Sequence, residues 1–309
     1  MITYTLHATN TIADFWKRRF IRLFPAMVFA SLITYLLMLM LDRDKVFVHG
    51  HSFLNVLCSV TFLPPDLLNK LFAPFHIECN YVSGSYWSLW PEIQFYFLAS
   101  LIYFLNKRGF TRNFSLLSIS VFLAWLLMYA IDQQKLPIQL PGIVMGAYKF
   151  CASVFNLPFY IPWFLTGVLL HEVFFHKATK FIWGCLFITV ALGFCACILW
   201  LGYTAVIIYT ASLLFFFLFI KYPGVFAHGF FRTLNKVGVA SYFLYLIHEN
   251  IGVLLVHRYG GYFQRLSGLF PLLVIIVLCV FSVLFYRAVE MPVSRFLKKV
   301  MFRANKVKK

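Results

Sequence analysis

The chain has 309 residues, of which 62% are hydrophobic and only 12% are charged. A soluble domain carries about 25% charged residues, and together with the mean hydropathy of +0.83 this excludes water as the solvent for most of the surface. The formal charge of +17 is interpreted as basic residues flanking membrane helices, so we expect the lipid bilayer and no nucleic acid as a partner.

Eight apolar segments are long enough to cross a bilayer, which takes about 20 residues of helix. The sequence therefore predicts an all-α polytopic bundle that forms one domain, 1–309. The spans are expected near 20–41, 87–105, 114–131, 157–175, 181–200, 203–220, 239–257 and 269–287. The third is short and is expected to extend at its ends. Weaker patches at 53–63 and 141–156 are interpreted as re-entrant or interfacial, because Pro64-Pro65 and Pro141-Gly142 interrupt them.

Basic residues predict the orientation of these spans. The amino-terminal stretch, alternate loops and the carboxyl tail together hold 20 of the 27 Lys and Arg residues. The side rich in Lys and Arg faces the cytoplasm, so both termini are expected there. The cysteines are scattered and show no metal-binding spacing. We interpret all of them as small core residues and expect no metal site: Cys58, Cys79, Cys151, Cys185, Cys195, Cys197 and Cys279.

A dense basic segment, residues 16–25, stands at the cytoplasmic mouth of the first span. It could serve only as an anchor for the helix. Alternatively, Arg19 and Arg22, three residues apart on one helix face, offer forked donors to a phosphate. Further along, His49 and His51 form a His-x-His pair in the following loop, which by itself is weak evidence for a metal.

Glu92 opens the second span, one residue after Pro91, which fits only the first turn of a helix. An acidic residue there can simply stabilise the helix end through the helix dipole. An ionisable residue within a membrane helix is also a candidate for function. The neighbouring Trp87 and Trp90 alone would suit an interfacial aromatic belt.

His248 is expected near the middle of the seventh span. Ser241, Tyr245 and His248 follow a helical spacing and share one face. A buried histidine can merely hydrogen-bond a neighbouring helix. A stripe of hydroxyls and an imidazole facing a bundle interior also suits a water-lined reaction chamber. At the end of the last span, Glu290 is expected to form a structural ion pair with Arg295 or with the basic amino-terminal segment, and Pro292 to end or re-aim the helix.

Taken together, these segments resemble the acyltransferase-3 family of integral membrane proteins. The similarity runs from about residue 15 to residue 295. The matching stretches are FWKRRFIRLFP at 15–25, GSYWSLWPEIQFY at 84–96, LNKVGVASYFLYLIH at 234–248, AVEMP at 288–292 and, more loosely, PWFLTG at 162–167. The WSL and SY…H blocks are specific, whereas the basic block alone is not.

The resemblance implies an O-acyltransferase of the bacterial inner membrane that needs no metal. It would move an acyl group, commonly acetyl, from cytoplasmic acyl-CoA to a hydroxyl of a cell-surface carbohydrate or lipid-linked glycan. Arg19 and Arg22 would bind the CoA phosphates, and Glu92 and His248 would be the catalytic candidates. The substrate would be lined by Trp87, Ser88, Tyr96, Ser241 and Tyr245.

The sequence departs from the family at its start. Family members usually have about ten spans, and the first helix carries an Arg followed by the His generally held to be the catalytic base. Residues 1–6 resemble the end of the family's second helix, so about one and a half helices are expected to be missing upstream. Two alternatives therefore stay open: a non-catalytic or incomplete membrane subunit, and a transporter of a lipid-linked glycan, although the chain has no clear internal repeat.

Overall fold

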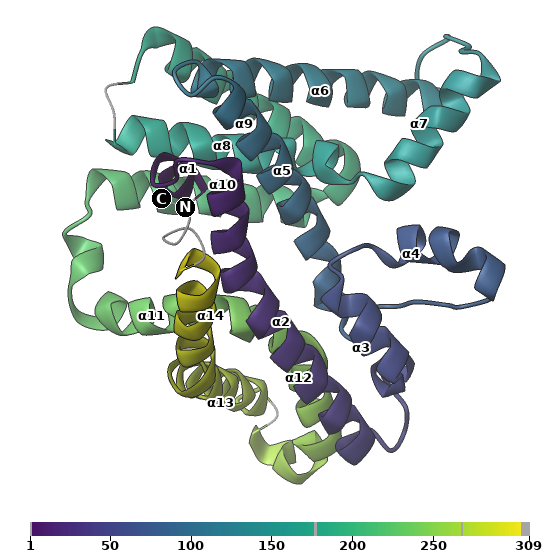
Figure 1. The fold of residues 1–309 in the computed structure, drawn as a ribbon, viewed down its shortest axis with the longest axis vertical. Helices are drawn as coiled ribbons and strands as arrows, with labels where there is room; N and C mark the ends of the chain where they lie inside the picture. Colours follow the sequence, from purple (N-terminus) through teal and green to yellow (C-terminus); the bar gives the residue numbers. More distant parts are fainter. Residues whose placement is uncertain (1, 176–177, 267, 304–309) are drawn as a thin grey trace. The chain divides into compact units, whose positions relative to one another are not determined.

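The computed structural model describes residues 2–175, 178–266 and 268–303, and all regular structure in this part of the chain is helical (Figure 1). The α-helices are α1 (Ile2–His7), α2 (Ile12–Leu41), α3 (Phe53–Val60), α4 (Pro65–Phe72), α5 (Leu89–Leu105), α6 (Phe110–Asp132), α7 (Gly142–Val154), α8 (Leu157–Phe175), α9 (Lys180–Ala196), α10 (Tyr203–Lys221), α11 (Gly229–Val239), α12 (Ser241–Tyr259), α13 (Phe270–Phe285) and α14 (Met291–Arg303). Short helical turns include η1 (Val48–His51) and η3 (Gly84–Ser88).

The all-α prediction is confirmed, and a helix forms at each of the eight predicted spans. Within the described residues, six helices are long and apolar enough to cross a membrane. They are Ile12–Leu41, Phe110–Asp132, Leu157–Phe175, Lys180–Leu201, Tyr203–Lys221 and Phe270–Phe302. The other two predicted spans correspond to α5, with 17 residues, and α12, which carries polar side chains at its centre. For these two helices the crossing stays a prediction.

Proline breaks the weaker apolar segments, as expected. α3 and the helical stretch that begins with α4 meet at an angle of 108°, because Pro65 starts α4 and Pro64 precedes it in an extended conformation. Such a pair is a broken span or a re-entrant loop. The last helix is different from the prediction, since it continues through Pro292 as α14. Its irregular turn comes earlier, as a π-helical stretch at Tyr286–Glu290.

The chain packs as two compact units, each made of segments that are distant in sequence. The first unit contains residues 1–15 and 91–228, and the second contains residues 16–90 and 229–309. This division does not decide whether residues 1–309 form a single domain, which stays a prediction.

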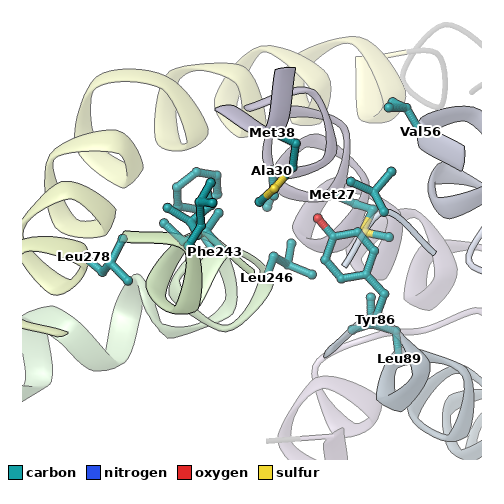
Figure 2. Packing of buried hydrophobic residues seen from close by; sticks show 14 of the residues in the cluster. Met27, Ala30, Met38, Val56, Tyr86, Leu89, Phe243, Leu246 and Leu278 are labelled. Carbon is teal, nitrogen blue, oxygen red and sulfur yellow. The ribbon is translucent and has the colours of Figure 1, made fainter. Parts of the chain in front are cut away.

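The second unit is held by a core between α2, η3, α12 and α13 (Figure 2). Tyr86 is fully buried in this core, with its hydroxyl near those of Ser31 and Thr34 of α2. Phe243 of α12 stacks on Phe285 of α13, with ring centroids 3.9 Å apart. This packing fixes η3 against α12, and the two elements together carry several residues predicted to bind substrate.

The first unit is built around α6, α8, α9 and α10. Gly193 of α9 faces the ring of Tyr209 so closely that a Cβ atom there would stand 2.3 Å from the hydroxyl oxygen. Tyr209 is 3% exposed and also reaches Thr166 of α8, with 3.4 Å between the hydroxyl oxygens. A small residue in α9 therefore allows the close packing of three helices.

Candidate active site

In the first unit, Glu92 lies in the first turn of α5, as predicted. Its half-buried carboxylate accepts a hydrogen bond from the hydroxyl of Tyr96, one turn further along the helix. Tyr96 is itself 4% exposed, and its ring contacts Phe15 edge to face. The N–H groups of the first turn stabilise the negative charge. The site thus presents an oriented carboxylate held by a buried phenol.

A residue that the sequence reasoning did not single out, Gln94, fixes this end of α5. Its side-chain amide donates to Asn156 Oδ1 at 3.2 Å, and its carbonyl oxygen accepts from the backbone N–H of Leu157 at 3.1 Å. The next residue, Phe95, stacks on Phe164 of α8 at 4.3 Å between ring centroids. These contacts join the start of α5 to α8. The available signal was the amide itself, a polar residue in an apolar helix that needs a partner.

In the second unit, Ser88 of η3 and Tyr245 of α12 are brought together. The Tyr245 hydroxyl lies 2.6 Å from Ser88 Oγ and donates to the carbonyl oxygen of Ser85 at 2.8 Å. Two residues predicted to line the substrate, 157 positions apart in sequence, therefore share one hydrogen-bonded cluster. Trp87, beside Ser88, is 46% exposed and available for contact with a ligand.

His248 lies beside Tyr245, with ring centroids 5.4 Å apart. Its Nδ1 is 2.7 Å from the backbone carbonyl oxygen of Tyr245. A carbonyl oxygen only accepts, so Nδ1 donates to it, and in the neutral form of the ring the lone pair lies on Nε2. The expected buried stripe is only partly correct: Tyr245 is half-buried, whereas Ser241 and His248 are exposed. The imidazole is thus accessible to a reacting group.

The basic segment begins α2, and only one of its two predicted phosphate ligands is accessible. Arg22 is exposed, whereas Arg19 is 3% exposed. Glu290 interacts electrostatically with Arg22, and the ion pair with the basic segment stays a prediction. The alternative partner, Arg295, instead donates to the sulfur atom of Met291 at 3.2 Å. The basic tail after residue 303, which contributed to the predicted orientation, lies outside the described residues.

α14 packs beside the start of α2. The Lys17 ammonium approaches the Met301 carbonyl oxygen at 3.4 Å, and Ser294 donates to the carbonyl oxygen of Ile21 at 3.3 Å. The Phe302 ring lies 5.6 Å from both Lys17 Nζ and Arg18 Cζ. The basic segment is therefore held on a second helix, and this placement limits the positions its charges can take.

Residues 42–83 connect α2 to η3, and hydrogen bonds and a disulfide hold this connection in place. Asp42 accepts backbone N–H bonds from Val46 and Phe47, both at 2.9 Å, and lies 2.9 Å from His51 Nε2. Burial alone would raise the pKa of Asp42, but the bonds from Phe47, His51 and Val46 outweigh it and hold the pKa below its ordinary value. His51 is therefore committed to Asp42.

One prediction about the cysteines is wrong. Cys58 and Cys79 form a disulfide, with Cα atoms 5.9 Å apart, and Cys195 is exposed. The signal was available, because the segment between the first two predicted spans contains two cysteines, and paired thiols outside the membrane core are candidates for a bridge. Asn69 bonds both the N–H and the carbonyl of Cys79, at 2.6 and 3.1 Å, and so fixes the same turn.

The predicted site residues therefore fall into three local groups. Glu92 and Tyr96 belong to the first unit; Ser88, Tyr245 and His248 form a cluster in the second; Arg19, Arg22 and Glu290 lie near the start of α2, also in the second. The side chain of Ser241 makes no hydrogen bond among the described residues. In that part of the chain, no three His, Cys, Asp or Glu side chains gather closely enough to hold a metal ion.

The chain was compared with protein families, curated proteins and solved structures. The family described as an acyltransferase domain, acyltransferase-3, matches residues 4–287. No curated protein and no solved structure matches the chain. The match covers most of the 309 residues and includes the residues of the three groups except Glu290, which lies beyond its end. This chain belongs to the acyltransferase-3 family and is an integral membrane acyltransferase.

Proposed function

We propose that this protein is an O-acyltransferase that moves an acyl group, acetyl in the simplest case, from cytoplasmic acyl-CoA to a hydroxyl of a cell-surface glycan. The hydroxyl oxygen attacks the thioester carbonyl carbon, and the C–S bond breaks. The hydroxyl proton passes to a base on the enzyme and then to the departing CoA thiolate. The products are an O-acyl ester and free CoA.

The orientation of α2 carries this proposal. α2 has 30 residues and is about 45 Å long, at 1.5 Å per residue, which exceeds the hydrocarbon thickness of about 30 Å. Its start carries Lys17, Arg18, Arg19 and Arg22, and its end leads into the segment with the Cys58–Cys79 disulfide. Disulfides persist outside the reducing cytosol, and basic residues favour the cytoplasmic side. Both features support a cytoplasmic amino terminus and an inner-membrane location.

The basic start of α2 suits the donor. CoA carries several phosphate groups, and arginine binds phosphate through two parallel N–H donors. The exposed Arg22 is proposed to contact a phosphate directly. Arg19 is buried, and we propose that it reinforces the positive potential and positions Arg22. The cation–π contacts of Lys17 and Arg18 with Phe302 keep this segment in place.

Two ionisable side chains are proposed to handle the proton. His248 offers an accessible Nε2 lone pair, since its Nδ1 proton is engaged by a carbonyl oxygen. Glu92 offers a carboxylate oriented by Tyr96. The hydroxyls of Ser88, Ser241 and Tyr245 and the exposed Trp87 are proposed to contact the substrates, and the resemblance to the family assigns Tyr96 to the same lining. A general base needs a free lone pair within hydrogen-bond reach of the reacting hydroxyl.

The test is acetyl transfer by membranes that contain the protein. The membranes are incubated with radiolabelled acetyl-CoA, and label is measured in the extracted glycan and after mild alkali, which cleaves O-esters. Glu92→Gln should insert normally and lose transfer, whereas Glu78→Gln, a change of the same type in an exposed residue, should keep it. Label in glycan that resists mild alkali, or full transfer by Glu92→Gln, would contradict the proposed reaction or the role of Glu92.

A further inference from the structure

A cavity in the second unit takes part in none of the steps above. Its volume is about 440 Å³, within the range of small-molecule sites of about 300–1,000 Å³. It is lined by residues 46–50, Pro65, Asn80, Tyr81, Val82, Gly84, Glu249 and Asn250. No residue proposed above for acyl transfer lines it. It is called the Glu249 cavity here.

Buried amides fix the wall of the Glu249 cavity. Asn250 is 5% exposed and donates to the Val82 carbonyl oxygen at 2.9 Å. Asn55 is 4% exposed; it donates to the His49 carbonyl oxygen at 2.9 Å and accepts from the backbone N–H of Asn80 at 2.9 Å. These bonds tie three separate segments together. The cavity is therefore preformed, which reduces the entropy lost when a ligand binds.

Four polar groups in the lining are not used by this framework. They are the Glu249 carboxylate, the side-chain amide of Asn80, the Tyr81 hydroxyl and the His49 imidazole. None of them makes a hydrogen bond to the described part of the chain, whereas the structural amides behind them are satisfied. This division separates residues that build the wall from residues that offer hydrogen bonds to the cavity.

Gly84 makes room for the most charged of these groups. A Cβ atom on Gly84 would stand 2.7 Å from Glu249 Oε1 and 3.1 Å from Oε2. Both distances are below ordinary van der Waals contact, so any larger residue would push the carboxylate away. The absent side chain of Gly84 therefore determines where the carboxylate lies.

The lining suits a polyhydroxylated molecule. Carboxylate and amide oxygens accept hydrogen bonds from hydroxyl groups, while the amide and phenol donate to them. Burial, assisted by the negative charge of Asp66, raises the pKa of Tyr81, so its phenol remains a donor. The remaining wall, with Val46, Phe47 and Val48 among its residues, is apolar and suits the C–H faces of a sugar ring. A single carboxylate is a poor set of ligands for a divalent cation.

We propose that the Glu249 cavity binds a sugar unit of the acceptor glycan, with Glu249 accepting hydrogen bonds from its hydroxyls. That the bound sugar is the acceptor rests on the acyltransferase function proposed above. The binding itself does not require acyl transfer. Glu249 directly follows His248 in α12, so a sugar held by Glu249 contacts the residue next to the proposed base.

The binding test uses purified protein in lipid nanodiscs without acyl-CoA. Saturation-transfer NMR is measured with four probes: the methyl glycosides of glucose, galactose, mannose and N-acetylglucosamine. At least one should bind saturably. Glu249→Gln and Gly84→Ala should each weaken that binding at least about tenfold, because a charge-assisted hydrogen bond is lost or displaced. Gly146→Ala is the matched control, because an added Cβ there meets no atom within 4 Å.

Two results would contradict the proposed sugar site. If no probe binds the wild type, or if both variants bind as the wild type does, the proposed site is wrong. Ethylamine is measured as a fifth probe, and saturable binding of ethylamine together with absence of sugar binding would make the cavity an amine site instead. Glu249→Gln removes the charge of the carboxylate, whereas Gly84→Ala displaces the carboxylate. If one variant fails to fold, the other therefore still tests the site.

Acetyl transfer is measured on the same preparations to separate the two proposals. Glu92→Gln should lose transfer and keep sugar binding. If the wild type binds sugar through Glu249 but transfers no acetyl group, the acyltransferase proposal fails and the sugar site stands. If transfer proceeds and Glu249→Gln changes neither sugar binding nor the KM for the acceptor, the sugar site fails alone.

Discussion

The Tyr245 hydroxyl lies 2.6 Å from Ser88 Oγ and donates to the Ser85 carbonyl oxygen at 2.8 Å. The Ser88 hydroxyl also lies 3.3 Å from the same carbonyl oxygen, so the two hydroxyls and the carbonyl form one hydrogen-bonded cluster. Tyr245→Phe and Ser88→Ala should therefore be coupled. We expect a coupling free energy of about 0.5–1.5 kcal/mol in a double-mutant cycle, measured by unfolding in mixed micelles. Strict additivity would show that the two hydroxyls do not interact in the membrane.

Removal of the exposed guanidinium at the start of α2 should affect the donor alone. Arg22→Ala is expected to raise the KM for acyl-CoA by about tenfold or more, since a charge-assisted phosphate contact is lost, with the KM for the acceptor unchanged. Steady-state kinetics with each substrate varied in turn provide the measurement. Arg43→Ala, an exposed arginine that follows the other end of α2, is the control. A rise in the KM for the acceptor would contradict the proposal that Arg22 binds a phosphate group of CoA.

Arg19→Ala should behave differently from Arg22→Ala. Arg19 is buried, so truncation also creates a cavity and is expected to lower the melting temperature as well as donor affinity. The measurements are the melting temperature and the KM for acyl-CoA of each of the two variants. Equal melting temperatures for both variants would mean that Arg19 has no packing role.

The Cys58–Cys79 disulfide predicts which side of the membrane residues 42–88 face. In a chain whose five other cysteines are alanine, an impermeant maleimide should label intact cells only after treatment with an impermeant reductant. A disulfide on the outer side explains that requirement. Cys58→Ser and Cys79→Ser should each label without reduction. Labelling that needs a permeabilised membrane would reverse the proposed orientation.

Gly193 permits the packing of α9 against Tyr209, and Gly193→Ala should destabilise the first unit. The added Cβ would meet the hydroxyl oxygen and two ring carbons of a buried tyrosine at 2.3–2.7 Å. Overpacking of this kind costs about 1–3 kcal/mol. Thermal unfolding in detergent measures the loss, and Gly184→Ala in the same helix, where an added Cβ meets nothing within 4 Å, is the control. Equal melting temperatures would show that the two helices can separate without cost.

Asp42 should make the segment 42–88 sensitive to acid. Its folded pKa is lowered, so it stabilises the fold above its unfolded pKa of about 3.9, and this contribution is lost as the pH falls through the folded value. Thermal unfolding between about pH 6 and pH 3 should show a loss of stability that Asp42→Asn lacks. The variant should also be less stable near neutral pH, because the bonds from Val46 and Phe47 weaken. An unchanged acid profile in the variant would exclude this role.

The sequence alone determined the solvent and the class of fold. Runs of apolar residues with few charges can be buried only in lipid, where helices satisfy every backbone group internally. The positions of Pro65 and Gly142 set the starts of α4 and α7 through local backbone geometry. Glu92 could be placed in the first turn of α5 for the same reason, since Pro91 beside it restricts the helix start.

Other features depend on contacts between segments that are far apart in sequence, and helical periodicity does not encode them. Ser88 and Tyr245 meet because the core around Tyr86 fixes η3 against α12. The disulfide depends on α3 and the turn at Cys79 approaching each other, and the exposure of His248 depends on which face of α12 the core covers. Gly84 reads as a flexible loop residue in the sequence, and only the tertiary structure places the Glu249 carboxylate against it.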